Sequence, residues 1–266
     1  MYAQTLVQLA ARMRHHQYAD GDVARGAAAH EFATRLFSGW HRPSGDPLLA
    51  HLVGTASILV ELRRPADTVV AGLLHAAYPN GDFGVPGGAT PRNRARVRRA
   101  IGEAAERYVH DFAATGWNEK SVPRIHTALA ALTDIDREVV TIRLANVLDD
   151  CLDRPYVTGQ AARHDGSMLS VWPLVVEIAE ALGYRGLAAE LRARRDAAEL
   201  PALPGRDGVF HVAPASYRLG WDIALRRGLA QIVGRLRSAL RLHTRWRGVT
   251  ARLFGSRAAA RSPTTR

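Results

Sequence analysis

Hydrophobic residues recur at spacings of three and four positions along most of the first 200 residues, which is the pattern of amphipathic α-helices. Few segments alternate strictly between apolar and polar residues, as half-buried strands do. The sequence therefore predicts an all-α fold. The predicted helices span residues 2–17, 23–40, 47–64, 67–78, 92–115, 122–132, 136–153 and 172–198, with a break in the last one near Gly183 and Gly186.

Turn-forming residues separate these helices. Pro47 suits the first turn of the helix over residues 47–64, because its missing N–H would have no intrahelical partner there. Asp67 is expected to cap the next helix. Residues 79–91 are rich in glycine and proline and predict a loop, in which Asp82 is expected to be a turn residue.

The distribution of charge divides the chain. Residues 1–205 hold equal numbers of acidic and basic side chains, whereas residues 206–266 hold 13 arginines and two acids and carry the whole net charge of +11. We expect a helical domain over residues 1–200. A linker over 201–208, a basic amphipathic helical tail over 209–255 and a disordered terminus over 256–266 are expected to follow.

Composition narrows the class of protein. Hydrophobic residues make up 47% of the chain, which is enough to build a buried core. No apolar run approaches the ~20 residues of a membrane span, and the first 22 residues lack the pattern of a secretory signal. The single cysteine, Cys151, excludes an internal disulfide and a cysteine-built zinc site. These features predict a cytoplasmic location.

Two histidines and two polar residues form a candidate metal site. His51 lies near the start of one predicted helix and His75 near the end of the next. Asn146 and Asp150 are four residues apart, which places them on one face of a later helix. Imidazole nitrogens and side-chain oxygens from separate helices can build a metal site in a helical bundle. The alternative is structural: histidines packed within helices and an asparagine bonded to nearby backbone.

Three short motifs carry a resemblance to a known family: Arg42-x-Ser44-Gly45-x-Pro47-x3-His51, Leu73-Leu74-His75 and Leu144-Ala145-Asn146-x-Leu148. Over about residues 26–195 the chain resembles the HD-type hydrolase domain of RelA/SpoT-family enzymes. The resemblance implies a helical bundle that uses manganese to remove pyrophosphate from guanosine tetra- and pentaphosphate. Iron and zinc stay open as alternative metals, independently of the resemblance. The resemblance further implies that His51, His75 and Asn146 bind the metal.

Arg42 is the candidate substrate-binding residue, because its planar guanidinium suits a phosphate or the face of a nucleobase. The alternative is a loop arginine that pairs with Asp46. Two phrases, His51-Leu52-Val53-Gly54-Thr55 and Leu73-Leu74-His75-x-x-Tyr78, are closer to a diverged and uncharacterised branch of HD-like proteins.

The chain departs from the family at four carboxylate positions, which are occupied by Ala76, Pro79, Asn80 and Asn146. An amide carries no charge, so a hard dication is poorly matched here. In the family, a Glu-Asp pair at the places of Pro79 and Asn80 prepares the attacking water. Without that pair there is no evident general base. Tyr78 and Asp150 are then the candidate catalytic residues. The structural alternatives are that Tyr78 is an aromatic residue packed at a helix end and that Asp150 belongs to a solvated helix end. Asp149 is, with Asp150, a candidate replacement for a lost ligand.

Two functions from different classes stay open. The first is a diverged metal-dependent phosphohydrolase that acts on a nucleotide or another phosphorylated small molecule. The second is a catalytically inactive HD-fold protein that binds a ligand or acts as a scaffold. HD-like oxygenase chemistry ranks third, because it uses more histidine and aspartate ligands than this sequence offers.

The basic tail has its own alternatives. Six apolar residues form one arc of a helix, with arginines outside it: Leu225, Leu229, Ile232, Val233, Leu236 and Leu240. This arc can pack on the main domain. Residues 219–254 can instead hold the protein peripherally at an anionic membrane surface. Contact with nucleic acid is the least favoured alternative, because the tail has no recognised nucleic-acid-binding motif.

Overall fold

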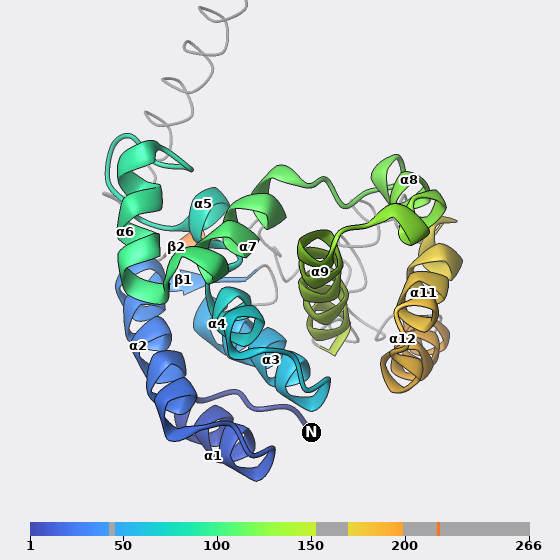
Figure 1. Ribbon diagram of the computed structural model, residues 1–266, viewed down its shortest axis with the longest axis horizontal. Helices are drawn as coiled ribbons and strands as arrows, with labels where there is room; N and C mark the ends of the chain where they lie inside the picture. The colour runs from blue at the N-terminus through green and yellow to red at the C-terminus, as the bar shows by residue number, and fades with distance from the viewer. Residues whose placement is uncertain (43–45, 153–169, 199–216, 219–266) are drawn as a thin grey trace, which may run out of the picture. The chain divides into compact units, whose positions relative to one another are not determined.

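A computed structural model describes residues 1–42, 46–152, 170–198 and 217–218. The chain divides into two compact units, residues 1–219 and 220–266, and all described residues belong to the first. The described residues are mostly helical, which confirms the predicted all-α class (Figure 1). The helices are α1 (Leu6–His15), α2 (Asp20–Phe37), α3 (Leu48–Glu61), α4 (Ala66–Leu74), α5 (Ala77–Asn80), α6 (Pro91–Ile101), α7 (Glu103–Ala114), α8 (Ser121–Thr127), α9 (Asp134–Leu152), α11 (Trp172–Ala181) and α12 (Arg185–Ala198), with a 3-10 turn, η1 (Leu129–Ala131).

Helices α3 and α4 form the centre of the first unit. Every residue of α3 from His51 to Val60 is buried, and so is α4 from Thr68 to Leu74. A helix that is apolar on all sides has to be covered on all sides. Helices α2, α7 and α9 pack against the pair and provide this cover (Figure 1).

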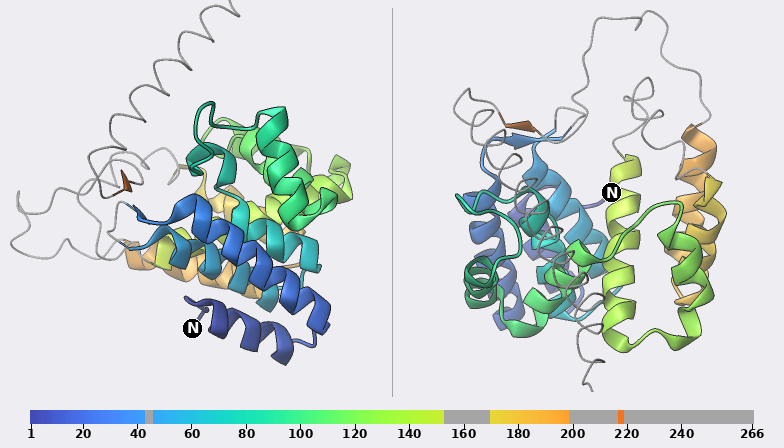
Figure 2. Two further views of the ribbon diagram at one scale, coloured as in Figure 1. Left: turned by 90° about the vertical axis from the view of Figure 1, so that its left-hand side faces the viewer. Right: turned by 90° about the horizontal axis from the view of Figure 1, so that it is seen from above.

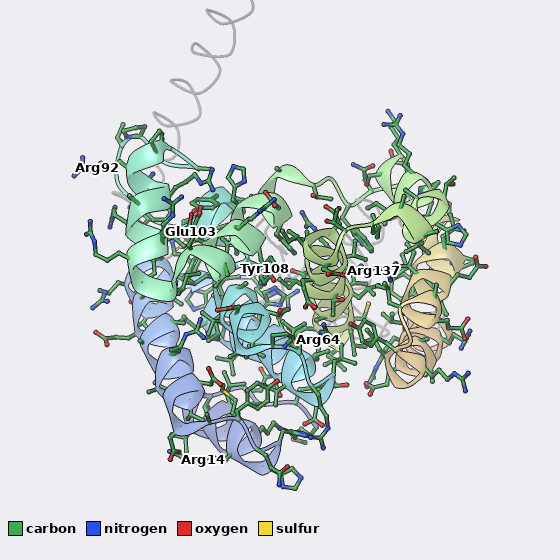
Figure 3. The ribbon with its side chains drawn as sticks, in the orientation of Figure 1. Arg14, Arg64, Arg92, Glu103, Tyr108 and Arg137 are labelled. Atoms are coloured by element: carbon green, nitrogen blue, oxygen red, sulfur yellow. The ribbon has the colours of Figure 1, made fainter. Side chains whose placement is uncertain are left out.

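Helix α9 lies between the α3–α4 pair and the α11–α12 pair (Figure 1, Figure 2). Near its start, Glu138 accepts hydrogen bonds from Thr68 Oγ1 at 2.8 Å and from Arg64 Nε at 3.2 Å. Arg64, labelled in Figure 3, belongs to the turn between α3 and α4. Near the end of α9, Asp149 contacts α3 at Gly54. Contacts at both ends therefore fix α9 against the central pair.

Several helix boundaries differ from the prediction. The single helix expected over 92–115 is wrong: it is two helices, because Gly102 has a φ of +88° and ends α6. Asp67 does not cap α4, because Pro65 occupies the N-cap position and the Asp67 carboxylate pairs with Arg25. The break predicted near Gly183 is confirmed, with a φ of +87°.

Three further boundaries moved. The helix expected over 67–78 ends at Leu74, and a turn separates it from the short α5. The first turn of α2 includes residues 20–22, which were expected to precede it. The stretch expected as one helix over 122–132 is α8 followed by η1.

The described part of the predicted tail is extended. Tyr217 and Arg218 form β2, which pairs antiparallel with β1 (Trp40–His41). These two residues are therefore a strand where the sequence predicted a helical tail, because their backbone bonds to β1. The linker over 201–208, the rest of the tail, its membrane-contact segment 219–254 and the terminus over 256–266 lie outside the described residues. No described helix combines the length and the apolar character needed to cross a membrane.

Candidate functional site

The structure brings the two candidate histidines together. His51 lies in the second turn of α3, and His75 is the C-cap residue of α4. Because α3 and α4 run in opposite directions, these two ends of the pair meet. The Nε2 atoms of the two rings lie 3.3 Å apart, and the rings meet edge to face. Both side chains are buried, with 6% and 3% of their surface exposed.

The second nitrogen of each ring is held by an oxygen that accepts a proton. His75 Nδ1 lies 2.7 Å from the carbonyl oxygen of Gly72, which can only accept, so Nδ1 carries the hydrogen. His51 Nδ1 lies 2.7 Å from Asp149 Oδ2 and donates to that carboxylate. A neutral imidazole protonated at Nδ1 has its lone pair at Nε2. Both lone pairs therefore face the same point between the rings.

Two facing lone pairs need a cation between them. A proton that converts one ring to an imidazolium would satisfy the pair as a hydrogen bond. A metal ion would satisfy it as well, because two nitrogens about 2.1 Å from one tetrahedral ion lie about 3.4 Å apart. The observed 3.3 Å fits both. A histidine ligand that donates its other ring N–H to a carboxylate or a carbonyl is the usual arrangement in metal sites.

Asp149 is placed by a glycine on the facing helix. A Cβ atom added to Gly54 would lie 1.9 Å from Asp149 Oδ1, so only glycine leaves room for the carboxylate. Asp149 is itself 2% exposed. The close approach of α9 to α3 at this point lets the carboxylate reach the His51 ring.

Asp150, the next residue, binds the other two candidates. Arg42 donates to Asp150 Oδ1 at 2.5 Å, and its second guanidinium nitrogen lies 3.9 Å from Asp149. Asn146 Nδ2 donates to Asp150 Oδ2 at 2.8 Å. Arg42 thus binds carboxylates at the edge of the histidine pair, and its backbone N–H donates to the Asp46 carbonyl oxygen. Within the described part of the chain, no hydrogen bond joins Asn146 to either histidine.

The surroundings keep His75 neutral. Burial, together with the charge of the neighbouring His51, lowers the pKa of His75 to about 3, against the opposing effects of Gly72 and Asp150. The ring also packs on Phe112, at 4.9 Å between centroids. A neutral imidazole is the form that binds metals. In the proton alternative, the same low pKa makes His75 the acceptor.

The ligand set implied by the family resemblance fits only in part. His51 and His75 could hold a metal through two nitrogens. Among the residues that the structure describes, no three histidine, cysteine, aspartate or glutamate side chains gather around one point. Any further coordination positions would then be left to water or to a bound ligand.

Tyr78 belongs to a separate cluster. Its hydroxyl donates to Glu106 Oε1 at 2.7 Å, and the same carboxylate accepts two bonds from Arg94, at 2.7 and 3.0 Å, and one from Arg98 at 3.4 Å. Burial and the Glu106 carboxylate raise the pKa of Tyr78. Asp82 is a turn residue as predicted, because its carboxylate accepts the Gly84 N–H.

Two features of the site escaped the sequence analysis. Asp149 appeared there only as a candidate replacement ligand, and its hydrogen bond to His51 was not foreseen. The signal was Gly54, a glycine within an otherwise apolar helix, which marks a close approach of another chain segment. The role of Glu106 as the centre of a buried cluster was also missed.

Comparison with known proteins supplies a partial match. A family model described as a domain of unknown function, DUF6817, matches residues 37–116. The matched stretch includes β1, Arg42, both candidate histidines and Glu106, and it ends before α9, which carries Asp149 and Asp150. No curated protein matches the chain significantly.

Proposed function

We propose that this chain is a diverged HD-like domain of the metal-dependent phosphohydrolase type, in which His51 and His75 hold a divalent metal ion. The ligand is a phosphorylated small molecule, such as a nucleotide of the guanosine polyphosphate kind. The observation that carries this proposal is the pair of Nε2 atoms 3.3 Å apart, each with its Nδ1 bound to an acceptor. This arrangement supports a metal ion between two buried imidazoles, with a shared proton as the alternative.

The ligand set changes the expected metal. The resemblance implies manganese, but manganese prefers oxygen ligands, whereas imidazole nitrogens suit iron and zinc. A site with two neutral protein ligands also binds a lone dication weakly, so phosphate oxygens of the ligand would strengthen binding. When bound, the ion would neutralise phosphate charge and lower the pKa of a coordinated water.

Arg42 would bind the phosphate in this proposal. The Asp150 carboxylate now occupies its guanidinium at 2.5 Å, and carboxylates and phosphates are bound by the same planar fork. An entering phosphate would therefore compete with Asp150 for Arg42. The Asp150 carboxylate then stands where the ligand's phosphate would bind.

A catalytically silent, ligand-binding version is the second candidate. Pro79 and Asn80, at the places of the family's Glu-Asp pair, lie in α5 and offer no carboxylate. Tyr78 is bound to Glu106 in the other cluster. Asp150, the other candidate for catalysis, is the one acidic side chain at the site whose carboxylate is partly exposed, at 26%. Hydrolysis of the bound ligand would then depend on the Asp150 carboxylate, after Arg42 has exchanged it for the ligand's phosphate.

Elemental analysis of untagged protein tests the metal directly. We expect iron, zinc or manganese to bind the unaltered chain after reconstitution with excess metal, and this binding to be lost in His51→Ala and His75→Ala. His110→Ala is the matched control, because His110 is partly exposed and pairs with Asp111 outside the site. A chain that binds no metal even after reconstitution would overturn the proposal.

Loaded protein is then assayed with guanosine tetraphosphate. Release of pyrophosphate that requires both histidines would support the hydrolase. Binding without release, measured by calorimetry, would support the silent version. A peripheral position at an anionic membrane, through residues 219–254, is a separate proposal that rests on the charge of the tail.

A further inference from the structure

Helix α6 carries five arginines and no acidic residue within eleven positions. One face of the helix is buried, through Asn93, Val97 and Ile101. Two of the arginines, Arg94 and Arg98, are bound to the buried Glu106 of α7. These contacts account for the side of α6 that meets α7.

The other three arginines form a separate stripe. Arg92, Arg96 and Arg99 lie four and three positions apart, which aligns them along one side of the helix over about 10 Å. Figure 3 shows Arg92 on the side of α6 turned away from α7. Arg96 donates to the Phe83 carbonyl oxygen and lies over that ring. None of the three has an acidic side chain in ion-pair contact within the described residues.

Like charges at these spacings oppose helix formation. On the α7 side of α6, the Glu106 carboxylate offsets the repulsion between Arg94 and Arg98. On the outer side, the described residues offer no such carboxylate. An anionic partner from outside would complete this face.

The loop that leads into α6 carries an exposed apolar residue and contacts Arg96 through the Phe83 carbonyl oxygen. Val85, in the loop that leads into α6, is 70% exposed and is one of the few large hydrophobic side chains exposed in the described part of the chain. The loop is held by the buried Asn93, whose Nδ2 donates to the carbonyl oxygens of Pro86 and Gly88 at 3.0 Å each. Val85 is therefore presented to solvent by a loop with defined contacts.

We propose that Val85, Arg92, Arg96 and Arg99 form a docking surface for an anionic lipid membrane, here called the α6 surface. Arginines attract acidic headgroups, and an apolar side chain next to them can enter the interface. Nucleic acid fits less well, because single strands need exposed aromatic rings for stacking. The neighbouring ring, Phe83, is already stacked with Tyr78 and covered by Arg96.

The test is sedimentation of the full chain with phosphatidylserine–phosphatidylcholine vesicles. Each arginine near an anionic surface contributes about 1 kcal/mol, or about fivefold in partition. Arg92→Gln combined with Arg99→Gln should therefore lower the partition coefficient about 25-fold. Val85→Ser should lower it at least about threefold with no change of charge.

The control removes the same charge elsewhere. Arg107 and Arg192 are exposed arginines paired with Asp111 and Glu180, so Arg107→Gln with Arg192→Gln should stay within about twofold of the unaltered chain. The α6 surface would be overturned if the Arg92/Arg99 variant matched this control, or if Val85→Ser bound as the unaltered chain does. It would also be overturned if the Arg92/Arg99 variant lost affinity for an oligonucleotide but not for vesicles. Circular dichroism checks that each variant is folded.

Discussion

The Glu106 cluster and the histidine cluster are both buried polar clusters of the first unit, and they are built in opposite ways. In the Glu106 cluster, one carboxylate accepts hydrogen bonds from Tyr78, Arg94 and Arg98, so every group has its complement. In the histidine cluster, the Nδ1 atoms of His51 and His75 are bound to oxygen acceptors, and their Nε2 atoms lie 3.3 Å apart. The first cluster is complete within the described residues, whereas the second is completed by a proton shared between the rings or, in our proposal, by a metal ion.

The difference separates a structural role from a functional one. Burial does not distinguish the clusters, because both are buried. The balance of donors and acceptors does, since a buried group without its complement costs free energy unless something supplies it. The charges around the pair are mixed: the carboxylates of Asp149 and Asp150 lie beside Arg42, and the buried guanidinium of Arg143 interacts with Asp150 and His75.

The largest effect is expected from Glu106→Ala. Removing a buried carboxylate leaves the Arg94 guanidinium and the Tyr78 hydroxyl unpaired, so the free energy of unfolding should fall by about 3–5 kcal/mol. Urea denaturation measures this. Metal content per folded molecule should not change. A loss of metal with little loss of stability would show that Glu106 belongs to the functional cluster.

Acid should affect the two clusters in different pH windows. Because the pKa of His75 is lowered to about 3, the unfolded chain binds the extra proton first, and metal-free protein should lose stability as the pH falls below about 6.5. The loss approaches about 1.4 kcal/mol per pH unit once the pH is well below 6.5.

Glu106 should lose its contribution only at lower pH. Burial raises its pKa, but the hydrogen bonds from Arg94 and Tyr78 outweigh burial and hold the pKa below the usual value, so its contribution is lost only below about pH 4.5. Urea titrations of the unaltered chain and of His75→Gln between pH 7 and 5 check the assignment. Identical slopes for the two proteins in this window would contradict it.

Asp149→Asn tests the support of His51. The amide keeps the shape but removes the charge that holds the ring, and loss of such a partner weakens metal binding by about 10–100-fold. Metal competition with a chelator measures the affinity. Asp150→Asn, one residue along, is the matched variant and should have the smaller effect, because Asp150 lies 3.8 Å from His51 Nδ1. Equal effects would remove the special role of Asp149.

Tyr78→Phe should have the smallest effect. It removes one hydrogen bond to a carboxylate that keeps both arginines, so we expect a loss of about 1 kcal/mol in the free energy of unfolding. Metal affinity should be unchanged. A drop in phosphate-ester turnover without a drop in stability would restore Tyr78 as a catalytic candidate.

Local patterns predicted most of the helices, because buried faces impose their period on the sequence. The break at Gly102 escaped, since one glycine within a helical pattern does not show that its φ is positive. The end of α4 at Leu74 escaped for a similar reason: Ala76 and Ala77 favour a helix, and only the tertiary structure turns the chain there.

The sequence predicted which residues belong to the site, but only part of how they contact one another. The family resemblance implied that His51 and His75 share a site, and the structure places them together. The partnership of Asp149 with His51 depends on how α9 packs against α3, which no local pattern encodes. Arg42 binding Asp150 likewise joins residues 108 positions apart.

The state of the two imidazoles tests the central claim most directly. Nitrogen-15 NMR of histidine-labelled protein, assigned with His51→Gln and His75→Gln, reports which ring nitrogens carry protons. We predict that, with one equivalent of zinc, both Nδ1 atoms are protonated and both Nε2 atoms shift to metal-bound values. An Nε2 that keeps its proton and does not respond to metal would contradict the account and make the pair a structural hydrogen bond.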